Sequence, residues 1–256
     1  MLDELPVQVT QDDLTTLITI NRPTARNALD AHAVTLLKQA FRDFDANDSS
    51  KVAVLHGRGG TFCAGADLKQ VAKGANYEPW AGSLDGMLGN PLSKPVIAAV
   101  EGHAVAGGLG IALYCDMRVA DDTAVFGVFC RRFGVPMSDG TTVRLPRLVG
   151  ESRAMAMMLT GRAVKAHEAL DFGLVSEVVA TGQAVTRAKE IAATIAQFPQ
   201  LAMLSDRRSL LESRGLSLEA ALLRENELAQ SAKAQSAASG AARFAAGEGR
   251  HGADTP

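Results

Sequence analysis

The chain has 256 residues, of which 47% are hydrophobic and 21% charged, so disordered and collagen-like chains are excluded. Its 26 Lys and Arg against 28 Asp and Glu give a formal net charge of −2. This balance argues against a nucleic-acid-binding surface, although it leaves room for a local basic cluster that binds a phosphorylated ligand.

Two apolar runs separated by polar residues open the chain. Residues 7–9 and 14–20 are rich in β-branched side chains and predict a β-hairpin whose turn is Thr10–Asp13. Pro23 ends the second strand, because proline cannot continue a hydrogen-bonded ladder. A helix is predicted from Asp30, with apolar residues at helical spacing: Val34, Leu37 and Phe41.

Short apolar strands and glycine-rich loops fill the middle of the chain. Strands are predicted at 52–55, 96–100 and 117–120, and an apolar helix restarts at 111–113. Strand, glycine loop and helix alternate in this way to about residue 180, which is typical of the α/β class.

The last quarter of the sequence is rich in Ala, Leu, Arg and Glu and predicts helices. Ser217 is a suitable N-cap. One helical face would then carry Leu218, Leu222, Glu225 and Ala229. We therefore expect an α/β core over residues 1–185 and a helical region over residues 186–256.

Targeting and metal-binding patterns are not found in the sequence. Residues 1–6 have no secretory signal pattern, and the apolar stretch 96–113 is interrupted by Glu101, His103 and glycines, which disfavours a membrane span. The three cysteines show no C-x-x-C spacing, and the histidines form no H-E-x-x-H motif. We expect a cytoplasmic protein with reduced thiols and no metal site.

Two glycine clusters, 56–68 and 101–110, each follow an apolar strand and lead towards a helix. Neither contains the P-loop pattern G-x-x-x-x-G-K-[ST] or the dinucleotide fingerprint G-x-G-x-x-G. Two interpretations remain open. The clusters either aim backbone N–H groups at an oxyanion or only allow tight packing of strand against helix.

Nearly the whole chain carries a set of motifs in a characteristic order. They are 21–29, 59–68, 94–104, Gly107-Gly108 with Cys115-Asp116, Phe126-Gly127, 144–150 and 166–175. In combination they resemble the enoyl-CoA hydratase/isomerase (crotonase) superfamily. The resemblance implies a crotonase-like spiral of β-β-α units in residues 1–185, with the CoA-thioester site, and a C-terminal α-helical region for trimerisation or lid formation in residues 186–256.

The same resemblance implies the ligand and the assembly. The expected substrate is an acyl-CoA or enoyl-CoA of fatty-acid or related metabolism, with coenzyme A as part of the substrate and no separate cofactor. A homotrimer or a dimer of trimers is expected, with no nucleic-acid partner. The family's oxyanion hole consists of two backbone N–H groups, which fall on Ala66 and Gly107. Loss of one such donor typically costs roughly 3–4 kcal/mol of transition-state stabilisation.

The catalytic carboxylates of the hydratases are missing from this sequence. The resemblance places two glutamates at positions that hold Gly110 and Cys130. Asp139 is the nearest replacement and is predicted to be either a general acid or base or a turn-forming aspartate. If only the base is missing, Gly110→Glu should raise hydration.

Contacts to coenzyme A are expected at Arg26, Ala64, Ala66, Asp67 and Leu68. Arg26 is the candidate phosphate ligand, or else an ordinary exposed cation. Asp67 is also expected to fix the turn that follows Ala66.

Other residues of the expected site have two interpretations each. Cys130 is either a thiolate nucleophile, activated by the two arginines that follow it, or a small buried apolar residue. His103 is interpreted as a packed or hydrogen-bonding histidine. Three residues either set the acyl-chain length or belong to the core: Trp80, Met87 and Leu88.

The sequence therefore predicts an enzyme, a lyase or isomerase, that stabilises a thioester enolate. The alternatives are a catalytically impaired acyl-CoA-binding protein or an isomerase that uses a single acid/base.

Overall fold

The computed structural model describes residues 5–74, 80–81 and 85–247 and has two compact units, Met1–Ala193 and Thr194–Pro256. The strands are β1 (Val7–Asp12), β2 (Thr15–Ile20), β3 (Val52–Gly57), β4 (Val96–Val100), β5 (His103–Val105), β6 (Met117–Asp121), β7 (Val125–Gly127), β8 (Val164–Lys165) and β9 (Glu177–Val179). The helices are α1 (Ala31–Ala46), α2 (Leu68–Val71), α3 (Gly107–Tyr114), α4 (Thr141–Val149), α5 (Glu151–Thr160), α6 (Ala166–Asp171), α7 (Ala184–Gln197), α8 (Gln200–Glu212) and α9 (Leu218–Ala246), with 3-10 helices η2 (Pro23–Ala25) and η3 (Phe129–Phe133).

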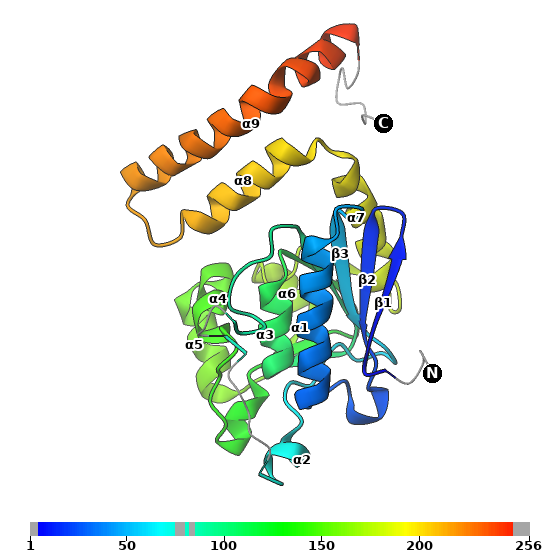
Figure 1. The fold of residues 1–256 in the computed structure, drawn as a ribbon. Coiled ribbons are helices and arrows are strands. Elements are labelled where there is room, and N and C mark those ends of the chain that lie inside the picture. Colours follow the sequence, from blue (N-terminus) through cyan, green and yellow to red (C-terminus); the bar gives the residue numbers. More distant parts are fainter. Residues whose placement is uncertain (1–4, 75–79, 82–84, 248–256) are drawn as a thin grey trace. The chain divides into compact units, whose positions relative to one another are not determined.

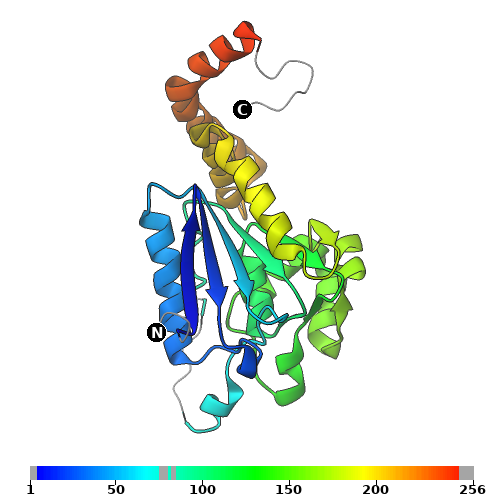
Figure 2. The same ribbon diagram turned by 90° about the vertical axis from the view of Figure 1, so that its right-hand side faces the viewer.

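A six-stranded sheet forms the centre of the first unit, in the order β1-β2-β3-β4-β6-β9 (Figures 1 and 2). The β1–β2 pair is antiparallel, which confirms the predicted hairpin, and all other pairs are parallel. The ladder continues to the pair Asp12–Thr15, so the turn is shorter than predicted, and Asp13 adopts the positive φ of 51° that a two-residue turn requires. Strands β3 and β4 are almost wholly buried, as parallel strands covered on both faces must be.

Helix α1 confirms the helix predicted from Asp30. The Asp30 side chain accepts a hydrogen bond from the N–H of Ala33 and so caps the helix N-terminus. The helix lies along the β1–β2 part of the sheet (Figures 1 and 2). Its buried face carries Leu37, Phe41 and Phe44.

Helix α3 follows the short strand β5 of a second sheet, ordered β5-β7-β8. It begins at Gly107, inside the second glycine cluster and earlier than the sequence predicts. Glycine at position 108 does not mark a loop here. It is needed for close packing, because a Cβ atom on Gly108 would collide with the carbonyl oxygen of Cys63. The helix is mostly buried and therefore holds its N-terminus in a fixed place relative to both sheets.

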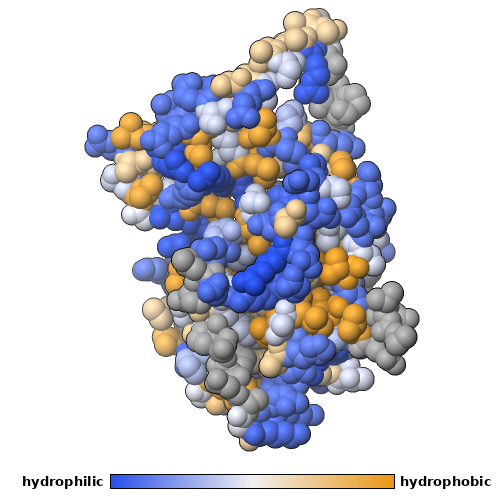
Figure 3. Space-filling view, in the orientation of Figure 1, coloured by the Kyte–Doolittle hydropathy of each residue, from blue (hydrophilic) through white to orange (hydrophobic). Residues whose placement is uncertain are grey.

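The second unit contains α8 and α9, which pack against each other. The Ser217 side chain caps α9, as predicted. Apolar patches interrupt the hydrophilic surface of these helices (Figure 3). Their exposed large apolar residues include Leu201, Leu210, Leu218, Leu222 and Leu223. None of the helices in the described ranges is long and apolar enough to cross a membrane.

Arg118 joins strand β6 to the end of α3. Its buried guanidinium donates hydrogen bonds to the carbonyls of Leu174 at 2.6 Å, Cys115 at 2.7 Å and Ala112 at 3.2 Å. A cation at the C-terminus of a helix also interacts favourably with the helix dipole. Arg118 thus fixes α3, whose opposite end lies at the second glycine cluster.

Replacing Arg118 by Met should destabilise the fold. The change removes three buried hydrogen bonds and leaves their carbonyl acceptors unpaired, so the free energy of unfolding should fall by about 3 kcal/mol. Urea unfolding would measure it. The matched control is Arg42→Met, because Arg42 is exposed and its ion pair with Asp85 is 3.9 Å long. A loss no larger than that of the control would contradict this role.

Candidate active site

A pocket of about 530 Å³, including its open mouth, lies in the first unit. Its wall is mainly apolar, with a few polar groups, as in small-molecule sites. The lining residues are Ala64, Ala66, Leu68, Ala106, Gly107, Phe129, Cys130, Phe133, Val135, Pro136, Met137, Ser138 and Asp139. Six residues that the sequence singled out are therefore at one site: Ala64, Ala66, Leu68, Gly107, Cys130 and Asp139.

The two glycine clusters meet at this pocket. Gly65 has a φ of 94°, and a Cβ atom there would lie only 2.8 Å from the backbone nitrogen of Gly107. Glycine is required at position 65 both for this conformation and for this close approach. Consequently Ala66 and Gly107 line the same pocket.

Isolated β-bridges hold the first cluster in place. Leu29 donates its N–H to Gly65 O and accepts from Asp67 N, at 2.8 and 2.9 Å. This parallel bridge uses the groups on either side of Ala66 and not the Ala66 N–H itself. Gly107 is the first residue of α3, where the N–H has no partner within the helix. Within the described ranges no acceptor engages either N–H.

Ala106, the N-cap of α3, has an unusual backbone conformation with φ 51° and ψ −127°. A non-glycine residue held there costs on the order of 1–3 kcal/mol, and such strain concentrates at functional sites. A hydrogen bond of 2.9 Å from the Ala106 N–H to Gly127 O helps to hold it. The conformation sets the direction of the following Gly107 N–H. Residue type gave no signal for Ala106, since strain of this kind is visible only in coordinates.

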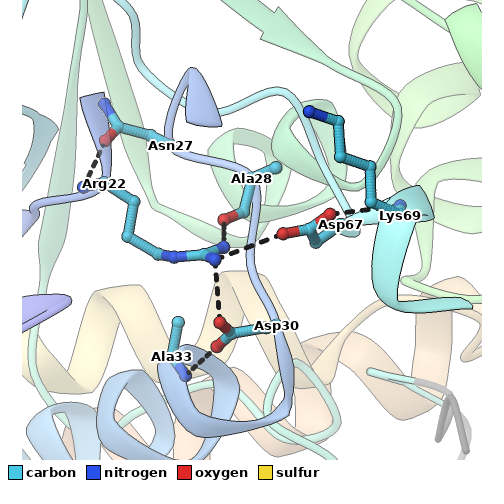
Figure 4. A network of polar contacts seen from close by, with 7 residues as sticks. All are labelled: Arg22, Asn27, Ala28, Asp30, Ala33, Asp67 and Lys69. Atoms are coloured by element: carbon cyan, nitrogen blue, oxygen red, sulfur yellow. Dashed lines mark hydrogen bonds and ion pairs between the residues drawn. The ribbon is translucent and has the colours of Figure 1, made fainter. Parts of the chain in front are cut away.

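Arg22 fixes the loop that carries Ala66 (Figure 4). Its guanidinium pairs with Asp30 at 2.8 Å and Asp67 at 3.2 Å and donates to the Ala28 carbonyl. Asp67 also accepts from the Lys69 N–H and caps α2, as the turn role predicts. Its carboxylate is committed to these contacts, and the residue does not line the pocket. Sequence reasoning missed Arg22, which it treated only as part of the motif 21–29.

Asp139 lies at the inner wall of the pocket and is only 4% exposed. Its Oδ1 accepts a hydrogen bond of 2.9 Å from the Thr141 N–H, and its backbone carbonyl accepts one of 3.1 Å from Arg144. Burial raises the pKa of the Asp139 carboxyl, and the Thr141 N–H opposes this only in part. The turn role and the pocket role predicted for Asp139 therefore coexist.

Cys130 is a poor nucleophile in this environment. Burial, and after it the negative charge of Asp139, raises the pKa of its thiol. The thiol is 2.9 Å from the sulfur of Met137. The guanidinium of Arg132 lies over the Phe129 ring, and Arg131 donates to the Met158 carbonyl. Arg131 does lower this pKa, but its effect is smaller than those of burial and of Asp139, so the net shift is upward and favours the interpretation as a buried apolar residue.

The remaining candidates are not among the residues that line this pocket. Arg26 is exposed, and its carbonyl accepts a hydrogen bond of 3.1 Å from the N–H of pocket-lining Ala64. His103 is half-buried in β5. Trp80, Met87 and Leu88 are buried in the core, as one of their two interpretations predicts.

Trp80 is close to the second glycine cluster, since a Cβ atom on Gly107 would lie 2.5 Å from the nearest atom of the indole. The apolar wall contributed by η3 and the loop after it was missed, because Phe129, Phe133 and Val135 show no periodic pattern in the sequence. In the part of the chain that the structure describes, no cluster of three His, Cys, Asp or Glu side chains is suited to a metal ion.

Comparisons with known proteins agree with this geometry. The family model described as enoyl-CoA hydratase/isomerase matches residues 12–248. The chain belongs to the enoyl-CoA hydratase/isomerase family. It is accordingly an enzyme of the lyase or isomerase type.

Its similarity to individual members of the family is substantial. The chain is 39% identical to enoyl-CoA hydratase EchA19 of Mycobacterium tuberculosis over 208 residues, which are 78% of this chain and 77% of the relative. It is 36% identical to 2,3-dehydroadipyl-CoA hydratase of Escherichia coli over 218 residues, 83% of this chain and 84% of the relative. An enoyl-CoA hydratase of M. tuberculosis H37Rv superimposes with a TM-score of 0.89 at 36% identity, covering 94% and 96% of the two chains. The predicted crotonase fold is confirmed.

The buried Asp139 carboxyl should make stability depend on pH. Its pKa is raised above the ordinary value of 3.8, so the folded chain keeps this proton to higher pH than the unfolded chain does. The stability of the wild type relative to Asp139→Asn should therefore fall as pH rises from below 3.8 through the raised pKa, and then stay constant. Urea unfolding at a series of pH values measures this difference. A difference that rises across the window would contradict the assignment.

Proposed function

We propose that the protein binds an acyl-CoA thioester, stabilises its enolate through the N–H groups of Ala66 and Gly107, and moves a proton with Asp139. One observation carries the proposal: the same apolar pocket is lined by the buried Asp139 and by two residues, Ala66 and Gly107, whose N–H groups have no acceptor in the described chain. The relatives named as hydratases of enoyl-CoA and 2,3-dehydroadipyl-CoA support a CoA thioester as the substrate.

The two N–H groups suit the charge that develops on a thioester oxygen. Removal of a proton next to the thioester carbonyl places negative charge on that oxygen. Donors that are already oriented stabilise this charge without rearranging, and each contributes roughly 3–4 kcal/mol. The strained Ala106 and the Arg22 contacts keep the two backbone segments in position.

Asp139 suits a proton transfer between two carbon atoms. As a carboxylate it would remove the C2 proton of a 3-enoyl thioester, and the C–H electron pair would form a dienolate. The resulting carboxylic acid would return the proton to C4, giving the 2-enoyl isomer and the restored carbonyl. Asp139 is the one Asp or Glu in the described pocket lining, which favours this double-bond shift over hydration.

Arg26 is proposed to bind a phosphate group of coenzyme A. Its exposed guanidinium has no hydrogen bond or ion pair with other described residues, and its backbone adjoins Ala64 at the pocket. Ala64, Ala66 and Leu68 would contact the thioester end of the ligand. We propose no separate cofactor, because coenzyme A forms part of the substrate.

Assembly and location are also proposals. The exposed leucines of α8 and α9 fit a subunit contact, so we propose a homotrimer or a dimer of trimers formed through the C-terminal region. The proposed place of action is the cytoplasm, in fatty-acid or related acyl-CoA metabolism.

Replacing Asp139 by Asn should abolish turnover and keep binding. The amide has nearly the same shape but cannot exchange the proton, so kcat should fall by about 10²- to 10⁴-fold. The measurement compares purified variants on 2-enoyl-CoA and 3-enoyl-CoA thioesters of several chain lengths, with binding followed by calorimetry. Asp122→Asn is the matched control, because Asp122 is exposed and does not line the pocket.

The outcomes separate the alternatives. Full turnover of Asp139→Asn would remove Asp139 from the mechanism. Binding without turnover by the wild type would favour an acyl-CoA-binding protein, which is suggested by Gly110 and Cys130 at the positions where hydratases have glutamates. The absence of any binding would refute the ligand assignment.

Replacing Arg26 by Gln should weaken substrate binding without slowing the chemical step. Loss of a charge-assisted phosphate contact should raise KM for the CoA thioester by about five- to tenfold, with kcat unchanged. The same acyl group on pantetheine, which lacks the nucleotide phosphates, serves as the control and should show no change. An equal effect on both substrates would exclude the phosphate contact.

A further inference from the structure

Gly110 is a buried glycine inside α3 for which the backbone gives no reason. It is not among the residues with positive φ, and it lies in a helix, where glycine is less favourable than alanine. Glycine is therefore needed at position 110 because a neighbouring group occupies the space that a side chain would fill.

That space is filled by Asp139. A Cβ atom on Gly110 would lie 2.6 Å from the Asp139 Oδ2 and 2.8 Å from the Asp139 Cβ. Both distances are shorter than any that a real Cβ atom adopts. The Asp139 carboxyl group thus packs directly against the Cα atom of Gly110 in helix α3.

Asp139 cannot simply move aside. Its Oδ1 is held by the Thr141 N–H and its carbonyl by Arg144. The preceding residue, Ser138, accepts a hydrogen bond of 3.0 Å from the Ala81 N–H. Since these contacts fix the loop on both sides, a side chain on residue 110 would have to displace the carboxyl group itself.

We propose that Gly110 is a positioning residue: its missing side chain creates the space that holds the Asp139 carboxyl at the pocket wall. The catalytic consequence rests on the proposed function, whereas the packing relation does not. The space between residues 110 and 139 has room for the side chain of only one of them. Under this proposal Gly110→Glu should not restore hydration by itself, because the glutamate would compete with Asp139 for the same volume.

A double-mutant cycle on stability tests the packing relation without any assay of activity. Gly110→Ala should lower Tm by about 4 °C or more, because the added methyl group overpacks the site. In the Asp139→Gly background, which lacks the three atoms nearest to an added Cβ, the same change should leave Tm unaltered or raise it. The matched control is Gly240→Ala in α9, where an added Cβ meets nothing within 4 Å.

The Tm outcomes are decisive in both directions. Equal Tm effects of Gly110→Ala in the two backgrounds, or stabilisation of the wild type by this change, would overturn the proposal. If Gly110→Ala fails to fold, recovery of folded protein in Gly110→Ala/Asp139→Gly supports it. Failure of that double variant, when Asp139→Gly folds, overturns it.

Kinetics test the consequence for the reaction. Gly110→Ala should lower kcat at least tenfold with little change in KM, and the acidic limb of its pH profile should move to lower pH as the displaced carboxyl regains solvent. A general loss of structure would lower activity without moving that limb. A gain in hydration from Gly110→Glu with Asp139 in place would also overturn the proposal. If the wild type has no turnover at all, the proposed function fails while the stability cycle still decides the packing relation.

Discussion

The close approach of two backbone segments, at Gly65 and Gly107, is the constraint on which the rest of the site depends. A Cβ atom at position 65 would come within 2.8 Å of the Gly107 nitrogen, so the segments can meet only if this side chain is absent. Each segment is then secured separately: the first by Arg22 and the bridge to Leu29, the second by burial of α3 and by Arg118 at its far end. Rigid elements thus hold two N–H groups that residue type does not specify, and the remaining pocket wall only has to supply apolar surface and one acid.

The acid differs from the N–H pair in the way it is held. Its carboxyl group comes from the loop before α4 and not from α3, and it is kept at the wall by the Thr141 N–H and by the shape of the helix. Burial both places the group and raises its pKa, so one cause accounts for its position and its proton affinity. The neighbouring Cys130 is subject to the same burial, which raises the pKa of its thiol.

Periodicity and turn chemistry predicted much of the first unit, including the hairpin, the Asp30 cap and the strands at 52–55, 96–100 and 117–120, because each is encoded over a few neighbouring residues. The order of the motifs predicted the family. The site residues inferred from that resemblance, Ala66, Gly107 and Asp139, line one pocket in the structure. The start of α3 was predicted too late, since glycine at 107 and 108 reflects packing against another segment. Arg22, Ala106 and the η3 wall depend on contacts distant in sequence or on backbone angles, for which residue type carries no signal.

The room beside Gly110 also restricts how such a protein can diverge. A side chain added to the helix first would overfill the wall, while an aspartate lost from the loop first would leave it without an acid and with a void. If the proposed packing relation and the proposed role of Asp139 both hold, any route between a helix-borne and a loop-borne carboxyl would cross a less stable or less active intermediate, whichever position changes first. The two sites are expected to vary as a linked pair across descendants, although they stand 29 residues apart in the chain (139 − 110).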